Sequence, residues 1–135
     1  MNNKKLGNGA ESELLKVLRG YGFWCHLLKD SASGQPFDII ATYEDNAFYF
    51  DSKTLLVANN FPFARIEDNQ VNSFEDLKKV GCYRTAFVIF KDFQFRVLTY
   101  AKYIEQYKLG KVSIPFKTLP LLSDYLRECL GYVSK

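Results

Sequence analysis

The sequence predicts an α/β fold with a mixed central sheet of about five strands flanked by helices. Three observations predict it. Residues 37–53 contain two apolar runs around a short polar turn, the pattern of a β-hairpin. Residues 85–90 are the most apolar run in the chain, which is typical of a strand buried on both faces. Segments with helical apolar spacing precede, separate and follow these runs, as expected when helices cover both faces of a sheet.

The amino-terminal half is expected to form a helix and three strands. Leucines recur at helical spacing, Asn8 can cap the helix and glycines can end it, so the helix is expected from about Gly9 to Gly20. The apolar segment Phe23–Leu28 is expected to be the first strand. The two hairpin strands then flank a polar turn at Tyr43–Asn46. A connecting loop is expected through Phe61-Pro62-Phe63, because Pro62 interrupts regular structure.

The carboxyl-terminal half is expected to add a helix, two strands and two more helices. An apolar stripe predicts a helix from Arg65 or Ile66 to Val80, with a glycine as its stop. Thr85–Phe90 is expected at the centre of the sheet, followed by an alternating strand at Phe93–Leu98. The remaining expected elements are a short helix at Ala101–Tyr107, a basic loop at Lys108–Lys117, and a final helix capped by Thr118 and ending at Gly131.

Length and composition predict one domain, residues 1–135, with a substantial core. The 135 residues are 47% hydrophobic and 16% aromatic, and twelve Phe and nine Tyr favour strands. The net charge of +3 permits a nucleic-acid partner without requiring one. The chain contains no apolar run approaching the ~20 residues of a membrane span and no signal-peptide pattern. Its three scattered cysteines fit reduced core residues, so a cytoplasmic location is expected.

The hairpin carries two acids where apolar residues would be easier to bury. Asp38 lies in its first strand, and Asp51 shares a face of the second strand with Lys53. If Glu44-Asp45 forms the tip, Asp38 lies opposite Asp51. If Asp45-Asn46 forms it, Asp38 lies opposite Lys53, and all three residues share one face in either register. Opposed carboxylates destabilise a sheet unless a cation lies between them, and a divalent metal suits oxygen ligands.

The alternative for these acids is a surface hairpin with a polar face. The apolar residues beside both acids favour a sheet covered on both sides, where an unpartnered carboxylate is costly. Two helical residues leave similar alternatives open. Glu11 lies on the apolar stripe of the first helix, where it either forms a capping box with Asn8 or points toward the hairpin acids. Gln70 interrupts an apolar helix face, where it either bonds main chain or orients water or phosphate.

These residues resemble the PD-(D/E)xK nuclease superfamily. The matching segments are Pro36-Phe37-Asp38 and Asp51-Ser52-Lys53, within a resemblance that spans roughly residues 7–91. Three further segments resemble Holliday junction resolvases of that superfamily. The opening Gly7-Asn8-Gly9-Ala10-Glu11 and the serine-bearing Ser31-Ala32-Ser33-Gly34 are similar to the archaeal type. Phe61-Pro62-Phe63 with Gln70 is similar to the RecU type, although the short hairpin turn leaves no room for that type's stalk insertion. The small size favours a compact, phage-encoded form.

The resemblance implies a restriction-endonuclease-like core and a metal-dependent endonuclease that resolves four-way DNA junctions. It implies that Glu11, Asp38 and Asp51, with the Ser52 carbonyl as a candidate extra ligand, hold one or two Mg²⁺ or Mn²⁺ ions. Lys53 would act on the attacking water, and Gln70 would position water or phosphate. No cofactor is expected beyond the metal, and no membrane partner.

Two equivalent scissile strands imply a two-fold homodimer. Residues expected to contact DNA are Lys29, Ser31, Ser33, Arg65, Lys78, Lys79, Lys108 and Lys111, with Arg84 and the rest of the basic loop. The alternatives are a repair or restriction nuclease of the same fold that acts on duplex or branched DNA, and an inactive DNA-binding module.

Overall fold

The computed structural model describes residues 3–28 and 35–131 of the chain. In order, its elements are α1 (Asn3–Gly20), β1 (Trp24–Leu27), β2 (Ile39–Tyr43), β3 (Asn46–Thr54), β4 (Asn60–Pro62), the 3₁₀ helix η1 (Phe63–Arg65), α2 (Asp68–Lys79), β5 (Thr85–Lys91), β6 (Gln94–Thr99), α3 (Tyr100–Lys108), β7 (Ser113–Pro115), the 3₁₀ helix η2 (Phe116–Thr118) and α4 (Leu122–Leu130). The predicted alternation of helices and strands is therefore present.

The main sheet has five strands in the order β1-β2-β3-β5-β6. Only the β3–β5 pair is parallel, so the predicted mixed sheet of five strands is confirmed. The middle strand is β3 rather than the expected Thr85–Phe90, because the two hairpin strands and β1 all lie on one side of β5. Residues 85–89 are nonetheless all buried, as expected for a strand covered on both faces.

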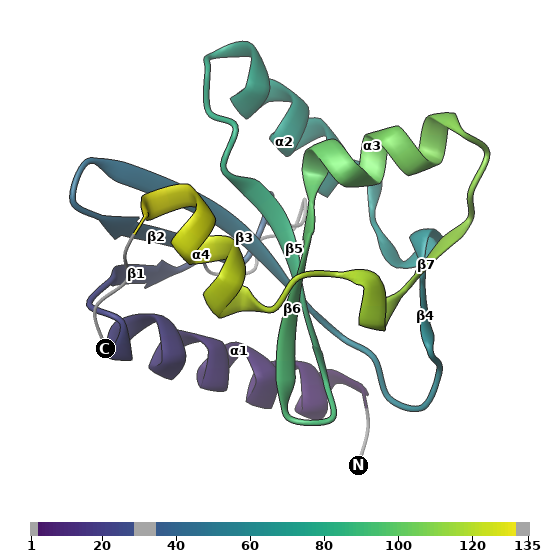
Figure 1. Ribbon diagram of the computed structural model, residues 1–135, viewed down its shortest axis with the longest axis horizontal. Coiled ribbons are helices and arrows are strands. Elements are labelled where there is room, and N and C mark those ends of the chain that lie inside the picture. The colour runs from purple at the N-terminus through teal and green to yellow at the C-terminus, as the bar shows by residue number, and fades with distance from the viewer. Residues whose placement is uncertain (1–2, 29–34, 132–135) are drawn as a thin grey trace.

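Helices cover both faces of this sheet, as Figure 1 shows. On one face, α1 and α4 pack against alternate residues of the strands, including Phe48, Phe50 and Val88. On the other face, α2, α3 and a small second sheet enclose a cluster that includes Phe74 and Phe87. Because side chains alternate along a strand, odd-numbered residues of β3 and β5 face this second cluster.

Several sequence-based boundaries were wrong, including the start of the second helix, which lies at Asp68 rather than Arg65 or Ile66. The first helix begins at Asn3 rather than Gly9, so Asn8 lies inside it and cannot cap it. The segment Phe61-Pro62-Phe63 is not all loop, because β4 pairs antiparallel with β7, which lies inside the expected basic loop. Thr118 closes η2, where its hydroxyl donates to the Pro115 carbonyl, and α4 begins only at Leu122. Gly131 does end α4, with a positive φ of 77° that suits glycine.

The three cysteines are free thiols; Cys25 is buried, whereas Cys82 and Cys129 are only partly so. His26 is exposed on the edge strand β1 and stacks against Trp24, which fits an edge residue rather than a metal ligand. Among the described helices, none has the length and apolar character needed to cross a membrane.

Candidate active site

The β2–β3 hairpin places the two acids side by side. Ile39 pairs with Phe50, and the Asp38 N–H donates to the Phe50 carbonyl at 3.0 Å, so Asp38 lies next to Asp51 just beyond the ladder. This is the first of the two predicted registers. The tip is Glu44-Asp45, where Glu44 has a positive φ of 54°. The hairpin turn therefore sets the position of the paired carboxylates.

Asp51 is a buried carboxylate with few partners. Its side chain is 1% exposed, and the Lys53 ammonium lies 3.1 Å from Oδ2. Neither Asp51 oxygen accepts a hydrogen bond of normal geometry from the described residues. Burial raises the pKa of this carboxyl to about 8, while Lys53 lowers it and Asp38 raises it further. An ionised Asp51 is therefore costly in this fold, even beside Lys53, unless a further cation binds next to it.

Asp38 is held by donors from two elements. The Ser52 main-chain N–H donates to its Oδ2 at 2.6 Å, and the Gln35 amide donates to its Oδ1. Asn69 in α2 donates in turn to the Gln35 carbonyl at 2.7 Å. This chain of bonds ties the start of α2 to the segment that leads into the hairpin, and it fixes the orientation of the Asp38 carboxylate.

Gln70 connects α2 with Lys53. The Lys53 ammonium donates to Gln70 Oε1 at 3.0 Å, and the Glu67 N–H donates to the same oxygen at 3.1 Å. The second bond belongs to a capping box between Gln70 and Glu67 at the start of α2. The expected main-chain bond is therefore present, and so is a link to the hairpin. Lys53 is held between Gln70 and Asp51, with its charge beside the acids.

One pocket of about 280 Å³ brings these residues together with Glu11 from α1. Its lining is Glu11, Gln35, Asp38, Asp51, Ser52, Lys53, Glu67, Asn69 and Gln70. Every residue for which the sequence predicted a catalytic or metal-binding role therefore lines it. In the described part of the chain, however, no three His, Cys, Asp or Glu side chains are close enough to form a ready metal centre. The two hairpin acids are paired, and Glu11 shares their pocket without completing a compact triad.

The pocket also contains three residues to which sequence reasoning gave no role: Gln35, Glu67 and Asn69. Glu67 and Gln70 have the spacing of a capping box, which is a recognisable signal for the start of α2. Gln35 and Asn69 interact through a side-chain amide and a main-chain carbonyl that are distant in the sequence, and no local pattern predicts such a bond.

Of the residues expected to contact DNA, those that the structure describes do not line this pocket. Lys29, Ser31 and Ser33 lie outside the described residues. Arg65 is exposed in η1, where its guanidinium donates to the Thr54 carbonyl and lies 5.5 Å from the Phe61 ring centroid. The other cations are exposed near the ends of helices: Lys78 and Lys79 at the end of α2, Lys108 at the end of α3 and Lys111 shortly after it.

Comparison of the sequence finds no matching protein-family model and no matching curated protein. Comparison of the structure does find proteins of similar fold. Hjc, a Holliday junction resolvase from the archaeal hyperthermophile Archaeoglobus fulgidus, superposes with a TM-score of 0.64 over 87% of this chain and 96% of its own. The chain has the Hjc nuclease fold. The D212 nuclease from a fusselovirus superposes with a TM-score of 0.50 over 91% of this chain and 87% of its own.

Both proteins are only 12% identical to this chain in sequence. At that identity the likeness establishes the architecture, and the chemistry has to be argued from the residues themselves. The Hjc fold confirms the α/β architecture and the resolvase-like core that the motif segments of the hairpin predicted.

Proposed function

We propose that this chain is a divalent-metal-dependent endodeoxyribonuclease that acts on branched DNA of the four-way junction type. The observation that carries the proposal is the juxtaposition of Asp38 and Asp51 beside Lys53, in one pocket with Glu11 and within the Hjc fold. Two adjacent carboxylates can hold a metal ion that assists phosphodiester hydrolysis, and an ammonium beside them can offset charge that develops on the phosphate.

The donor set of the pocket fits a hard divalent cation. Three carboxylates and the Ser52 main chain supply oxygen ligands, which Mg²⁺ and Mn²⁺ prefer. Among the described residues, the ion pair of Lys53 with Asp51 Oδ2 leaves Oδ1 without a hydrogen-bond donor, so Oδ1 is available as a ligand. Asp38, Asp51 and Glu11 would hold one or two ions. When bound, the metal would polarise the scissile phosphate and lower the pKa of a bound water.

The remaining groups would act directly on the substrate. Lys53 would offset the charge that develops on phosphorus and would orient the attacking water, since Gln70 and Asp51 hold its ammonium at 3.0 and 3.1 Å. Gln70 would position Lys53 and, through it, the phosphate. Hydrolysis would leave a 5′-phosphate. Because a four-way junction has two equivalent scissile strands, paired nicks call for two copies of the chain related by a two-fold axis.

The test compares Mg²⁺-dependent cleavage of a synthetic four-way junction, a fork and a linear duplex of the same sequence. Paired nicks in the junction are expected, with weaker cleavage of the duplex. Asp51→Asn should abolish cleavage, whereas Asp45→Asn, the same change at the exposed hairpin turn, should preserve it. Equal cleavage of all three substrates would favour a duplex or repair nuclease. Absence of metal-dependent nicking would favour a DNA-binding module.

A further inference from the structure

The β5–β6 hairpin ends in a turn whose residues are costly to hold there. Asp92 and Phe93 both have positive φ, 50° and 61°, in a two-residue loop closed by the Lys91–Gln94 pair. Such loops favour Asn-Gly, and Phe is a poor residue for a left-handed conformation. Phe93 is also 95% exposed, so its ring contributes little burial to the fold. The fold gains little from a phenylalanine at this position.

The exposed ring has aromatic support at its base. Phe93 meets Phe90 edge-on, with ring centroids 6.4 Å apart and an interplanar angle of 89°. Phe90 in turn packs on Phe95 with centroids 4.7 Å apart. Phe90 therefore contacts the Phe93 ring from one side only, and most of the ring surface is free to stack against another planar group.

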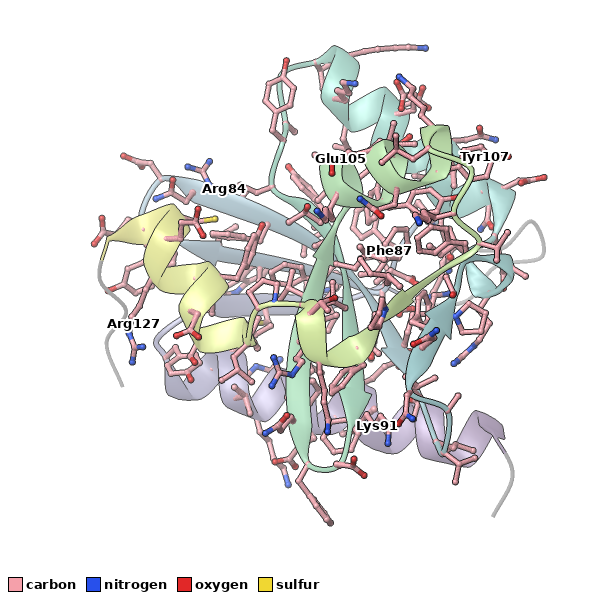
Figure 2. The ribbon with its side chains drawn as sticks, turned by 45° about the vertical axis from the view of Figure 1, so that its right-hand side comes forward. Arg84, Phe87, Lys91, Glu105, Tyr107 and Arg127 are labelled. Carbon is pink, nitrogen blue, oxygen red and sulfur yellow. The ribbon has the colours of Figure 1, made fainter. Side chains whose placement is uncertain are left out.

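A basic pocket of about 460 Å³ lies at the same end of the hairpin. Its lining includes Lys91, Asp92, Gln94, Arg96, Phe116 and Lys117, so three cations face one acid. The Lys91 side chain is only 11% exposed, and its ion-pair partner Asp92, 3.0 Å away, is 78% exposed. Figure 2 shows Lys91 near the lower end of the hairpin, with Arg84 beyond the other end of β5.

Arg96 is fixed in this pocket by contacts on several sides. Its Nη1 donates to the Leu119 carbonyl at 2.6 Å, and its guanidinium lies 5.5 Å from the Phe116 ring centroid. A cation that is already oriented loses little freedom when an anion binds. The pocket therefore suits a phosphate group, which the net positive lining attracts.

Sheet register relates this hairpin to the candidate active site. Lys53 pairs with Ile89, and Ile89 pairs with Arg96, so these three residues form one row across one face of the sheet. Strand β5 continues from Ile89 to Lys91 and then enters the Asp92-Phe93 turn. Because β3 runs parallel to β5, the turn lies toward the end of the sheet at which β3 also ends. Strand rise and spacing then place the tip on the order of 10 Å from the main chain of Lys53. Asp51 pairs with Phe87, two residues farther from the turn, so the same strand rise places the acids on the order of 20 Å from the tip. A DNA strand held by the acids would therefore reach the tip several nucleotides away.

We propose that the β5–β6 tip is a stacking wedge for DNA, and this rests on the function proposed above. Phe93 would stack on a base that has lost a neighbour at a branch point, while the pocket of Lys91, Arg96 and Lys117 holds an adjacent phosphate. Inserting the ring into intact duplex would require unstacking a base step, whereas a branch point already offers an open base face. The tip would therefore select DNA with an interrupted base stack.

The test measures binding rather than cleavage, using a fluorescent four-way junction and the matched linear duplex in a Ca²⁺ buffer. Phe93→Ala should weaken junction binding about tenfold to a hundredfold and duplex binding far less, and Phe93→Trp should restore it. Tyr83→Ala is the matched control, since Tyr83 is 72% exposed but precedes β5 at its opposite end. Lys91→Gln should weaken binding of the junction and of the duplex alike. It should also reduce the salt dependence of the binding constant by about the amount expected for one phosphate contact.

A second readout follows the base itself. A 2-aminopurine at the branch point should be quenched by the natural protein and by Phe93→Trp, but not by Phe93→Ala. Junction binding unchanged by Phe93→Ala, or an equal loss for duplex, would overturn the wedge. The wedge would also be overturned if the natural protein sediments as a dimer and Phe93→Ala sediments as a monomer. That result would mean that Phe93 contacts a second copy of the chain rather than DNA. Binding without metal-dependent nicking would instead refute the nuclease and leave the wedge standing.

Discussion

Replacing Asp51 by Asn should stabilise the metal-free protein, although the residue is at the centre of the candidate site. In the fold, this carboxyl is 1% exposed and accepts no hydrogen bond from the described residues. Burial raises its pKa from 3.8 to about 8, with Asp38 adding to the rise and Lys53 opposing it. Asparagine has nearly the same shape but carries no ionisable group, so it removes the cost of the charge.

The sign of the pH dependence follows from this pKa. A carboxyl whose pKa is higher in the folded state gives its full stability below pH 4, and that stability is lost as the pH rises toward 8. At about 1.4 kcal/mol per pKa unit, the loss between pH 4 and pH 7 is on the order of 4 kcal/mol. The Asn variant should lack this loss, so its stability advantage should grow by a few kcal/mol over that range.

The assay is urea unfolding of both proteins in EDTA at several pH values, followed by circular dichroism. Carboxyl groups distant from residue 51 titrate alike in both proteins and cancel in the difference of unfolding free energies, so that the difference reports Asp51 and its interaction with Asp38. Mg²⁺ should then stabilise the natural protein and leave the Asn variant almost unchanged, because binding to the folded state adds stability by mass action. Unfolding free energies that run parallel with pH would show that Asp51 is ionised without cost, and the metal argument would lose its basis.

Three further predictions concern other parts of the molecule. Lys53→Met should reduce junction cleavage at least a hundredfold, measured under single-turnover conditions, while Mg²⁺ still raises thermal stability; loss of that metal response would assign Lys53 to folding instead. Gln35→Ala removes a donor that orients the Asp38 carboxylate and should weaken Mg²⁺ binding, measured by calorimetry; Gln106→Ala, the same change at a half-buried residue outside the pocket, is the control. Phe74→Ala removes a fully buried ring and should lower the unfolding free energy by about 3–5 kcal/mol; a loss below 1 kcal/mol would mean that the second cluster can repack.

The acidic hairpin could be predicted because its signal is local. Alternation places Asp38, Asp51 and Lys53 on one face, and burial of an acid among apolar residues is informative by itself. The register could not be settled from sequence, since both candidate tips are polar, and the structure selects Glu44-Asp45 as the tip by pairing Tyr43 with Asn46. Helical phase left Glu11 open between a capping box with Asn8 and a position facing the hairpin acids. Because α1 begins six residues earlier than expected, Asn8 is not at its start, and Glu11 lines the pocket.

The features that escaped prediction depend on contacts between distant segments. Strands β4 and β7 are three residues long, and each contains a proline, so neither has a period that could be recognised. The bond from Asn69 to the Gln35 carbonyl links a helix to a loop through side-chain geometry alone. The tip residue Phe93 was assigned to a strand because its apolar character fits one, yet its backbone is left-handed in the turn.

The pairing of β4 with β7 has a consequence for synthesis of the chain on the ribosome. Every residue of the candidate site precedes position 71, but the strand that pairs with β4 is made only at Ser113–Pro115. A nascent chain that already exposes the paired acids therefore still lacks part of the layer that covers the second cluster. Domains generally fold as units once their parts have emerged, so the layer over the second cluster can close only after residue 115 has left the ribosome.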